Sequence, residues 1–195
     1  MSDADLTYVE GYLHRLTGAI EQLDKDAVAC FISLLRQRRR RDGTIYIIGN
    51  GGSAGTASHF AVDLGKGASL ASDKRFRVHS LTDNVCWITA LANDLSYADV
   101  FVEQLRNHLR EEDLLVAISA SGNSENILRA VALANEIGCM TVGLTGGNGG
   151  RLANLVDVEI RVPAEHMGCI EDLHLIVAHI VSYSFMDRPE AADEW

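Results

Sequence analysis

The chain has 195 residues, a mass of 21.2 kDa and a hydrophobic fraction of 47%, which favours a single domain spanning residues 1–195 with one sizeable core. Its formal net charge of −10 and isoelectric point near 5.1 argue against nucleic acid or an anionic membrane as the main partner, because the average surface repels both. Residues 1–6 carry acids, and no run approaches the 18 apolar residues of a membrane span, so we expect a cytoplasmic protein.

Residues 1–43 predict two amphipathic helices. The first has a narrow apolar seam with a spacing of three and four residues, typical of a helix that packs against another helix: Leu6, Val9, Leu13, Leu16, Ile20 and Leu23. Asp24 can cap the second helix, whose apolar stripe comprises Val28, Phe31, Ile32 and Leu35. Two such helices ahead of a sheet suggest helical packing between subunits.

The second helix ends in an arginine run, Arg36 and residues 38–41, followed by Asp42 and Gly43. Such a run can serve as a nucleic-acid or polyphosphate patch. Cations in a last helical turn also complement the helix dipole, and the Asp-Gly pair stands where a C-cap is expected. We therefore predict a solvated helix end.

Residues 44–186 alternate short apolar runs with helical patterns. The predicted strands are 45–48, 78–81, 114–118, 140–144 and 158–162. After a short helical stretch that carries His59, the predicted helices are 85–92, 99–108, 124–137, 151–155 and 170–185. This alternation predicts an α/β fold whose parallel sheet is covered by helices on both faces, with residues 187–195 as a tail.

Four cysteines are scattered through the apolar segments: Cys30, Cys86, Cys139 and Cys169. Disulfide frameworks and zinc knuckles use closer spacings. Buried free thiols are therefore expected.

The first strand runs into a glycine turn, Gly49-Asn50-Gly51-Gly52-Ser53. Because this turn opens a helix, its backbone N–H groups and serine hydroxyl lie where oriented amides and the helix dipole stabilise a phosphate. The turn therefore predicts an anion site beside whatever reactive groups the following helix carries.

Two alternatives remain for the glycine turn. Glycine can serve only a tight corner between strand and helix. Residues 49–54 also fit the dinucleotide pattern G-x-G-x-x-G/A, which requires an acidic residue about 20 residues further on to hold a ribose. Asp73 has that spacing, but it lies in a polar stretch before the next strand.

A serine turn, residues 119–124, follows the third predicted strand and opens the next helix. The hydroxyls of Ser119, Ser121 and Ser124, together with backbone N–H groups, predict a neutral phosphate site that needs no lysine. A helix N-cap would explain Ser124 alone. A third glycine cluster, residues 146–150, predicts a flexible turn.

Carboxylates and imidazoles supply the candidate chemistry. His59 and Asp63 are four residues apart, so they share one helix face at the spacing of two metal ligands or an acid–base pair. A histidine that only packs in the core is the alternative for His59. The apolar final helix carries Glu171, Asp172, His174 and His179, and helical geometry does not choose which carboxylate accompanies His179.

Several motifs together resemble the sugar isomerase (SIS) domain and, within it, the phosphoheptose isomerases. They are the glycine turn with His59, the pair Asn93-Asp94, the serine turn, Leu144-Thr145-Gly146, Arg161-Val162-Pro163 and the helix 170–179. This resemblance covers nearly the whole chain. It implies a five-stranded parallel sheet and a homotetramer with N-terminal helices packed between subunits and active sites near the interfaces.

The resemblance implies conversion of sedoheptulose 7-phosphate, a small-molecule sugar phosphate, to a heptose 7-phosphate with one Zn2+ or another divalent ion. The implied metal ligands are His59, Asp63, Glu171 and His179, and the implied catalytic residues are Asp63, Glu171 and His179. The implied substrate-binding residues are Asn50, Gly51, Gly52, Ser53, Asn93, Asp94, Ser119, Ala120, Ser121, Ser124 and Glu171.

Two positions depart from the family pattern. Asp63 stands where the family usually has a glutamate that acts as base and ligand, and Glu171 stands where it has a glutamine. We hypothesise that the role of base has migrated to Glu171. The family often has an arginine near Gly67, where this chain has Lys66, and polar residues at the positions of Gly168 and Cys169. These differences would allow specificity for a different sugar.

Because of these differences from the family pattern, two other functions remain possible. One is a non-catalytic sugar-phosphate-binding adaptor, like the replication-initiator-associating relatives of phosphoheptose isomerases. The other is an isomerase for a different ketose phosphate, such as an eight-carbon one.

Overall fold

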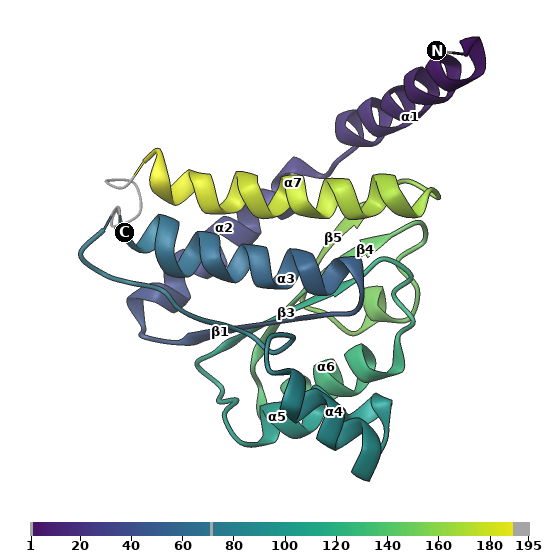
Figure 1. Ribbon diagram of the computed structural model, residues 1–195. Helices are drawn as coiled ribbons and strands as arrows, with labels where there is room; N and C mark the ends of the chain where they lie inside the picture. The colour runs from purple at the N-terminus through teal and green to yellow at the C-terminus, as the bar shows by residue number, and fades with distance from the viewer. Residues whose placement is uncertain (1, 71, 189–195) are drawn as a thin grey trace.

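A computed structural model describes residues 2–70 and 72–188 of the chain. Its centre is one sheet of five parallel strands in the order β2-β1-β3-β4-β5 (Figure 1). The strands are β1 (Thr44–Gly49), β2 (Arg77–Ser80), β3 (Leu114–Ser119), β4 (Met140–Gly146) and β5 (Val158–Val162). All five predicted strands are confirmed, and the predicted tail lies outside the described residues beyond position 188.

The helices are α1 (Asp3–Glu21), α2 (Lys25–Arg40), α3 (Gly52–Val62), α4 (Val85–Asp94), α5 (Val102–Arg106), α6 (Glu125–Ile137) and α7 (Met167–Met186). Short turns are η1 (Asp63–Ala68, a π-helix) and the 3-10 turns η2 (Tyr97–Asp99) and η3 (Leu152–Asn154). The predicted helix 99–108 is thus shorter, and 151–155 makes only one 3-10 turn. Few residues separate the glycine cluster from β5, and a single tight turn is what fits there.

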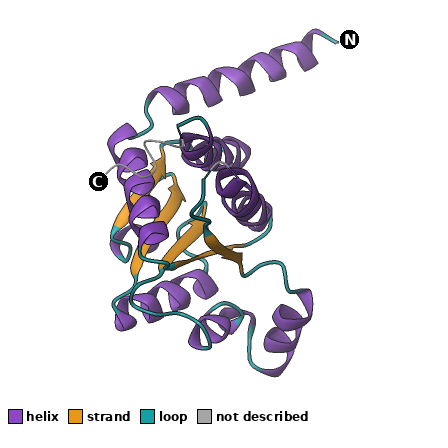
Figure 2. Cartoon of the chain, turned by 90° about the vertical axis from the view of Figure 1, so that its left-hand side faces the viewer, coloured by secondary structure: helices purple, strands orange, loops and turns teal. Residues whose placement is uncertain are grey.

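Alternate strand residues face opposite sides of the sheet. Ile45 and Ile47 face a core completed by α2, α3 and α7, whereas Tyr46 and Ile48 face a core completed by α5 and α6. Figure 2 shows helices on both sides of the sheet. The predicted architecture, a parallel sheet covered on two faces, is confirmed.

The two N-terminal helices differ in what they cover. The stripe of α2 is buried against the sheet of its own chain, with Phe31 and Leu35 at 0% exposure, so packing between subunits is not needed to cover it. The seam of α1 stays largely exposed, with Val9 at 50% and Leu13 at 56%. Figure 1 shows α1 projecting from the body of the molecule.

The prediction of a solvated arginine end for α2 is wrong for Arg38 and Arg39, whereas Arg41 is exposed as expected. Arg38 and Arg39 are only 6% and 2% exposed. The Arg39 guanidinium lies over the rings of Phe76 at 5.0 Å and Phe185 at 5.4 Å, and Arg38 Nη1 donates to the backbone oxygen of Glu112 at 3.2 Å. The run is therefore used inside the fold, because arginine can bury its stem and stack its planar cation on aromatic faces.

The prediction about the cysteines is half right. All four thiols are free, and Cys139 and Cys169 are buried, but Cys30 and Cys86 are exposed. Burial raises the pKa of the Cys139 thiol to about 12. That thiol therefore stays protonated and unreactive at neutral pH.

The final helix α7 is long and apolar enough, by length and composition, to cross a membrane. Half of the apolar 18-residue stretch that meets this criterion is buried within the fold, and α7 packs against α3 and the sheet. A core helix meets the same criteria, and the packing of α7 is that of a core helix.

Candidate active site

The sheet changes its winding direction between β1 and β3, because β2 lies on one side of β1 and β3 on the other. Ligands of such sheets bind at this switch point, outside the carboxyl ends of the strands. Gly49 of β1 pairs with Ile118 of β3. The glycine turn and the serine turn therefore leave the sheet side by side at the same edge.

A reciprocal amide pair joins the two turns. Asn50 Nδ2 donates to Asn126 Oδ1 and Asn126 Nδ2 donates to Asn50 Oδ1, each at 2.9 Å. The Tyr97 hydroxyl also donates to Asn50 Oδ1 at 2.9 Å. The sequence analysis missed Asn126 and Tyr97, although an amide in the first turn after the serine turn was a signal for Asn126. These bonds make the two turns one structural unit.

The glycine turn begins α3 with the N-cap Gly51 at a positive φ of 55°, and among the described residues no side chain caps the helix. The Glu171 carboxylate, from α7, lies against Gly52, where an added Cβ would overlap it. Ser53 is 5% exposed. A helix N-terminus stabilises a negative group, so the turn has the character of an anion site with a carboxylate already beside it.

The position of Asp73 speaks against dinucleotide binding. Asp73 is exposed and precedes β2, so it lies toward the amino end of that strand. A residue that holds a ribose would have to stand at the carboxyl edge, beside the glycine turn.

The serine turn begins α6. Ser119 is 5% exposed, and its hydroxyl lies 3.5 Å from that of Ser124. Ser124 is the N-cap residue, yet its side chain makes no cap hydrogen bond within the described residues. The Ser121 hydroxyl accepts from the Asn123 N–H at 3.2 Å. Helix capping alone therefore does not account for Ser124, and the cluster offers hydroxyl donors to a ligand.

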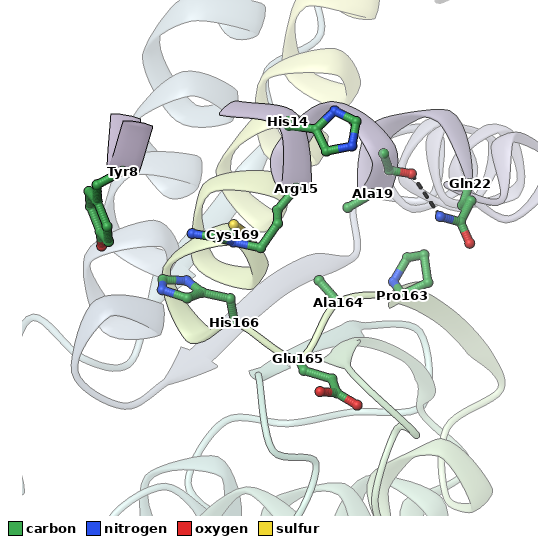
Figure 3. A pocket seen from close by; sticks show the side chains of 11 residues that line it. Tyr8, His14, Arg15, Ala19, Gln22, Pro163, Ala164, Glu165, His166 and Cys169 are labelled. Carbon is green, nitrogen blue, oxygen red and sulfur yellow. Dashed lines mark hydrogen bonds between the residues drawn. The ribbon is translucent and has the colours of Figure 1, made fainter. Parts of the chain in front are cut away.

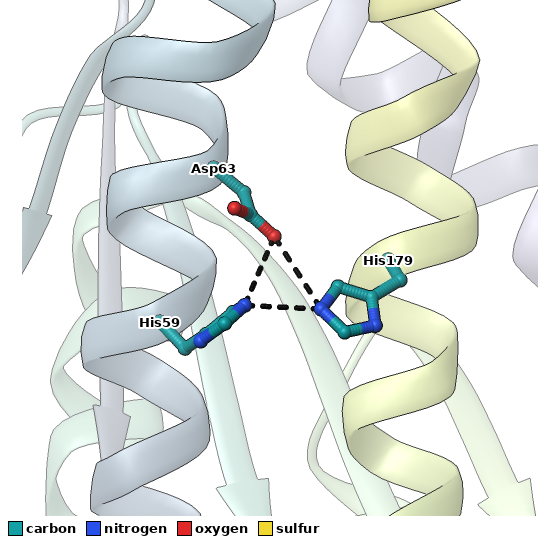
Figure 4. A group of neighbouring side chains, drawn as sticks. All are labelled: His59, Asp63 and His179. Carbon is teal, nitrogen blue, oxygen red and sulfur yellow. Dashed lines mark hydrogen bonds and ion pairs between the residues drawn. The ribbon is translucent and has the colours of Figure 1, made fainter.

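Two imidazoles and one carboxylate converge between α3 and α7. His59 Nε2 lies 3.4 Å from Asp63 Oδ2, His179 Nε2 lies 3.7 Å from the same oxygen, and the two Nε2 atoms are 3.0 Å apart. Figure 4 shows all three ligand atoms pointing to one place. Helix α3 continues into the π-turn η1 at Asp63, and π-turns recur at functional sites.

This triad fits a divalent metal ion. Asp63 Oδ2 is buried and accepts no hydrogen bond among the described residues, with the two imidazole nitrogens of the triad near it. A cation bound between the three atoms would satisfy this oxygen. Three ligands of one tetrahedral zinc ion, each about 2.0–2.1 Å from it, lie about 3.3 Å from one another. The observed separations of 3.0 to 3.7 Å bracket that value.

Glu171 is not part of this convergent group. It precedes His179 by eight residues on α7, about 12 Å along the helix axis, and its carboxylate lies at the glycine turn instead. The neighbouring Asp172 accepts a 2.6 Å hydrogen bond from the Tyr12 hydroxyl of α1. This hydrogen bond raises the pKa of Tyr12. Asp63 thus faces the two imidazoles, Glu171 the glycine turn and Asp172 the Tyr12 hydroxyl.

Asn93 and Asp94 end α4 and are exposed, with Asn93 Nδ2 donating to Asp94 Oδ1 at 2.9 Å. The segment that follows them reaches the glycine turn through the Tyr97 hydrogen bond to Asn50. The pair therefore lies directly before a segment that contacts the glycine turn.

His174 is fully buried, and its Nε2–H donates to the Thr145 backbone oxygen at 3.0 Å. Burial lowers the pKa of His174 to about 4, so the ring is neutral at pH 7. It joins α7 to the carboxyl end of β4 and is not a member of the triad.

Comparison with known proteins agrees with this geometry. A sequence model of the SIS domain family matches residues 7–146. The chain therefore belongs to the SIS domain family.

Within this family the chain is similar to phosphoheptose isomerases. The enzyme of Helicobacter pylori is 35% identical over 179 residues, which cover 91% of this chain and 92% of that one. The structure of phosphoheptose isomerase GmhA from Neisseria gonorrhoeae matches with a TM-score of 0.86 and 30% identity over 93% of this chain and 98% of that one. The Francisella tularensis phosphoheptose isomerase gives 0.87 and 29%, with coverages of 96% and 100%. The resemblance deduced from the motifs is confirmed, and the chain is a sugar phosphate isomerase of the aldose–ketose type.

Proposed function

We propose that the chain converts sedoheptulose 7-phosphate to D-glycero-heptose 7-phosphate at the edge of the sheet where the two turns lie, with the help of the His59, Asp63 and His179 triad. The observation that carries this proposal is that the donor-rich turns lie at one edge of the sheet, joined by the Asn50–Asn126 amide pair. The ester phosphate binds the hydroxyls and N–H groups of the serine turn. The glycine turn and the Asn93-Asp94 pair contact the sugar beside it.

His59, Asp63 and His179 would hold the divalent ion, with zinc the best match to two imidazoles and a carboxylate. When bound, this ion polarises the carbonyl of the open-chain sugar. Its ligands come from α3, η1 and α7. Asp63 Oδ2 accepts no hydrogen bond within the described residues, which supports its assignment as a ligand.

Glu171 supplies the base in this proposal. Its carboxylate removes a proton from the carbon next to the carbonyl, which leaves an enediol, and returns that proton to the adjacent carbon. His179, whose Nε2 belongs to the triad, would exchange hydroxyl protons through its other ring nitrogen, Nδ1. Glu171 stands outside the triad, so its carboxylate is not weakened as a base by a bound metal ion. The role also requires this carboxylate to reach the carbon next to the carbonyl that the ion polarises.

The first test is an isomerase assay on ketose 7-phosphates and 8-phosphates, run with and without a chelator. We expect turnover of the seven-carbon substrate, loss of activity with the chelator and recovery with zinc. Preference for an eight-carbon substrate would replace the proposed sugar. Binding without turnover of either substrate would support the adaptor function instead.

We further propose that the chain works as a cytoplasmic homotetramer with α1 between subunits. The exposed seam of α1 supports this, as does a cavity of about 800 Å³ between α1 and the segment that follows β5. Figure 3 shows His14 and Arg15 of α1 across this cavity from Glu165 and His166. Light scattering should give the mass of four chains, and a monomeric mass would refute this arrangement.

A further inference from the structure

The glycine cluster supports the serine turn from behind. We call residues 146–152 the brace. The Gly146 N–H donates to the Ala120 oxygen at 3.0 Å, and the Leu152 N–H donates to the Gly122 oxygen at 2.9 Å. The brace is therefore bonded at both ends to the loop proposed to hold the phosphate, so the turn predicted to be flexible at 146–150 is part of a hydrogen-bonded segment.

These bonds decide which polar groups the serine turn can offer. The two oxygens that the brace occupies would repel a phosphate dianion if they turned toward it. Because the brace holds them, the hydroxyls and remaining N–H groups form the ligand side. A further bond, from the Arg151 N–H to Asn123 Oδ1 at 3.1 Å, fixes the far end of the turn.

Brace and turn approach too closely for a side chain at their contact. A Cβ on Gly122 would overlap the backbone oxygen of Gly149, and Gly122 has a positive φ of 63°. Any shift of Gly149 is therefore transmitted directly to the serine turn.

Glu159 of β5 lies against the brace and is bonded to its neighbours on β4 and β5. Its Oε1 accepts from the Thr145 hydroxyl at 2.6 Å and from Arg161 Nε at 3.0 Å, and its Oε2 accepts from Arg161 Nη2 at 2.5 Å. The same carboxylate lies against Gly149, where a Cβ would overlap Oε1. Burial would raise the pKa of Glu159, but the bonds from Arg161 and Thr145 outweigh it and lower the pKa. The carboxylate is thus an ionised support behind the brace.

We infer that Glu159 is a positioning residue for the substrate phosphate, which it never touches: it fixes the brace, and the brace fixes the donor groups of the serine turn. This inference rests on the proposed function, since it assumes a phosphate at that turn. Preorganised donors bind an anion more tightly because no ordering has to accompany binding.

The test compares Glu159→Ala and Glu159→Gln with the wild type. Glu159→Ala should raise KM for the sugar phosphate about tenfold, the effect of one lost hydrogen-bonding contact, and should weaken competition by inorganic phosphate equally. The kcat should stay within about threefold, and Glu159→Gln, which keeps an acceptor for Thr145, should recover part of the loss. Glu103→Gln, which breaks the exposed pair with Arg106, is the matched control and should change neither constant.

Hydrogen exchange supplies a second measurement that does not depend on turnover. Glu159→Ala should speed amide exchange in residues 119–124 and leave residues 50–58 unchanged. If Glu159→Ala does not fold, Thr145→Val removes one bond of the same support and should give a smaller effect in the same direction.

The outcomes separate the two ideas. A wild type that binds phosphate, with a Glu159→Ala variant of equal phosphate affinity and exchange, overturns the role of Glu159 alone. A fall in kcat at constant KM also overturns it. A wild type that binds no phosphate overturns the proposed function and this inference together.

Discussion

The glycine turn and the serine turn begin helices at neighbouring strand ends, yet they differ in charge and in support. The glycine turn has the Glu171 carboxylate against Gly52 and leads into the helix that carries His59. The serine turn contains no charged residue and is bonded to the brace. A dianionic phosphate is repelled by a nearby carboxylate but not by neutral donors. Under the proposed function, this difference divides one edge of the sheet into a place for proton transfer and a place for the phosphate.

The strongest challenge to this division is Glu171→Gln. If Glu171 is the base, kcat should fall by about 10²–10⁴-fold, while the metal content measured by atomic emission stays at the wild-type level because the triad is intact. Asp63→Asn should lose bound metal. Asp172→Asn, one residue along the same helix and bonded to Tyr12, is the control and should keep kcat within about threefold.

The opposite result would move the base. Full turnover in Glu171→Gln, combined with an inactive Asp63→Asn that still binds metal, assigns proton transfer to Asp63. The glycine turn would then only bind the substrate, and the two turns would no longer differ in catalytic role.

The burial of His174 of α7, which is hydrogen-bonded to Thr145 of β4, makes the stability of the fold depend on pH. The pKa of His174 is lowered from 6.5 to about 4 in the folded state, so the unfolded chain binds more protons between these values. The contribution to stability is therefore complete above pH 6.5 and is lost as the pH falls toward 4, with a loss of about 2 kcal/mol at pH 5.

Urea unfolding at pH 7 and pH 5 measures this effect. His174→Asn should reduce the difference in unfolding free energy between the two pH values by that amount. The exposed His14→Asn should keep the wild-type difference. An unchanged difference in His174→Asn would show that the fold does not hold this ring neutral.

The smallest expected effect belongs to the serine turn itself. Ser119→Ala removes one buried hydroxyl and should raise KM about tenfold with kcat within about threefold. The exposed Ser33→Ala should change nothing. If Ser119→Ala instead lowered kcat at constant KM, the serine turn would take part in the chemistry, and the division between the turns would fail.

The glycine turn and the serine turn could be predicted from the sequence because each depends on residues that are close together in the chain. Short runs of four or five residues predict the strands, and the residues that follow a parallel strand lie at its carboxyl edge. The spacing of His59 and Asp63 likewise places both on one helix face. Side-chain burial at element ends was not predictable in this way, as Arg38 and Arg39 demonstrate.

The amino-acid sequence by itself determined the five parallel strands, the helices that cover them, the two donor-rich turns at one edge and the pairing of His59 with Asp63. The family resemblance implied that His179 joins this pair, but residue spacing did not. Only the tertiary structure decided that it does, that Glu171 lies at the glycine turn, that Asp172 bonds Tyr12 and that Glu159 lies against the brace. The physical reason is the range of the interactions: hydrophobic periodicity and turn chemistry act between residues near in sequence, whereas these contacts join side chains from separate elements whose relative positions are set by packing in the common core.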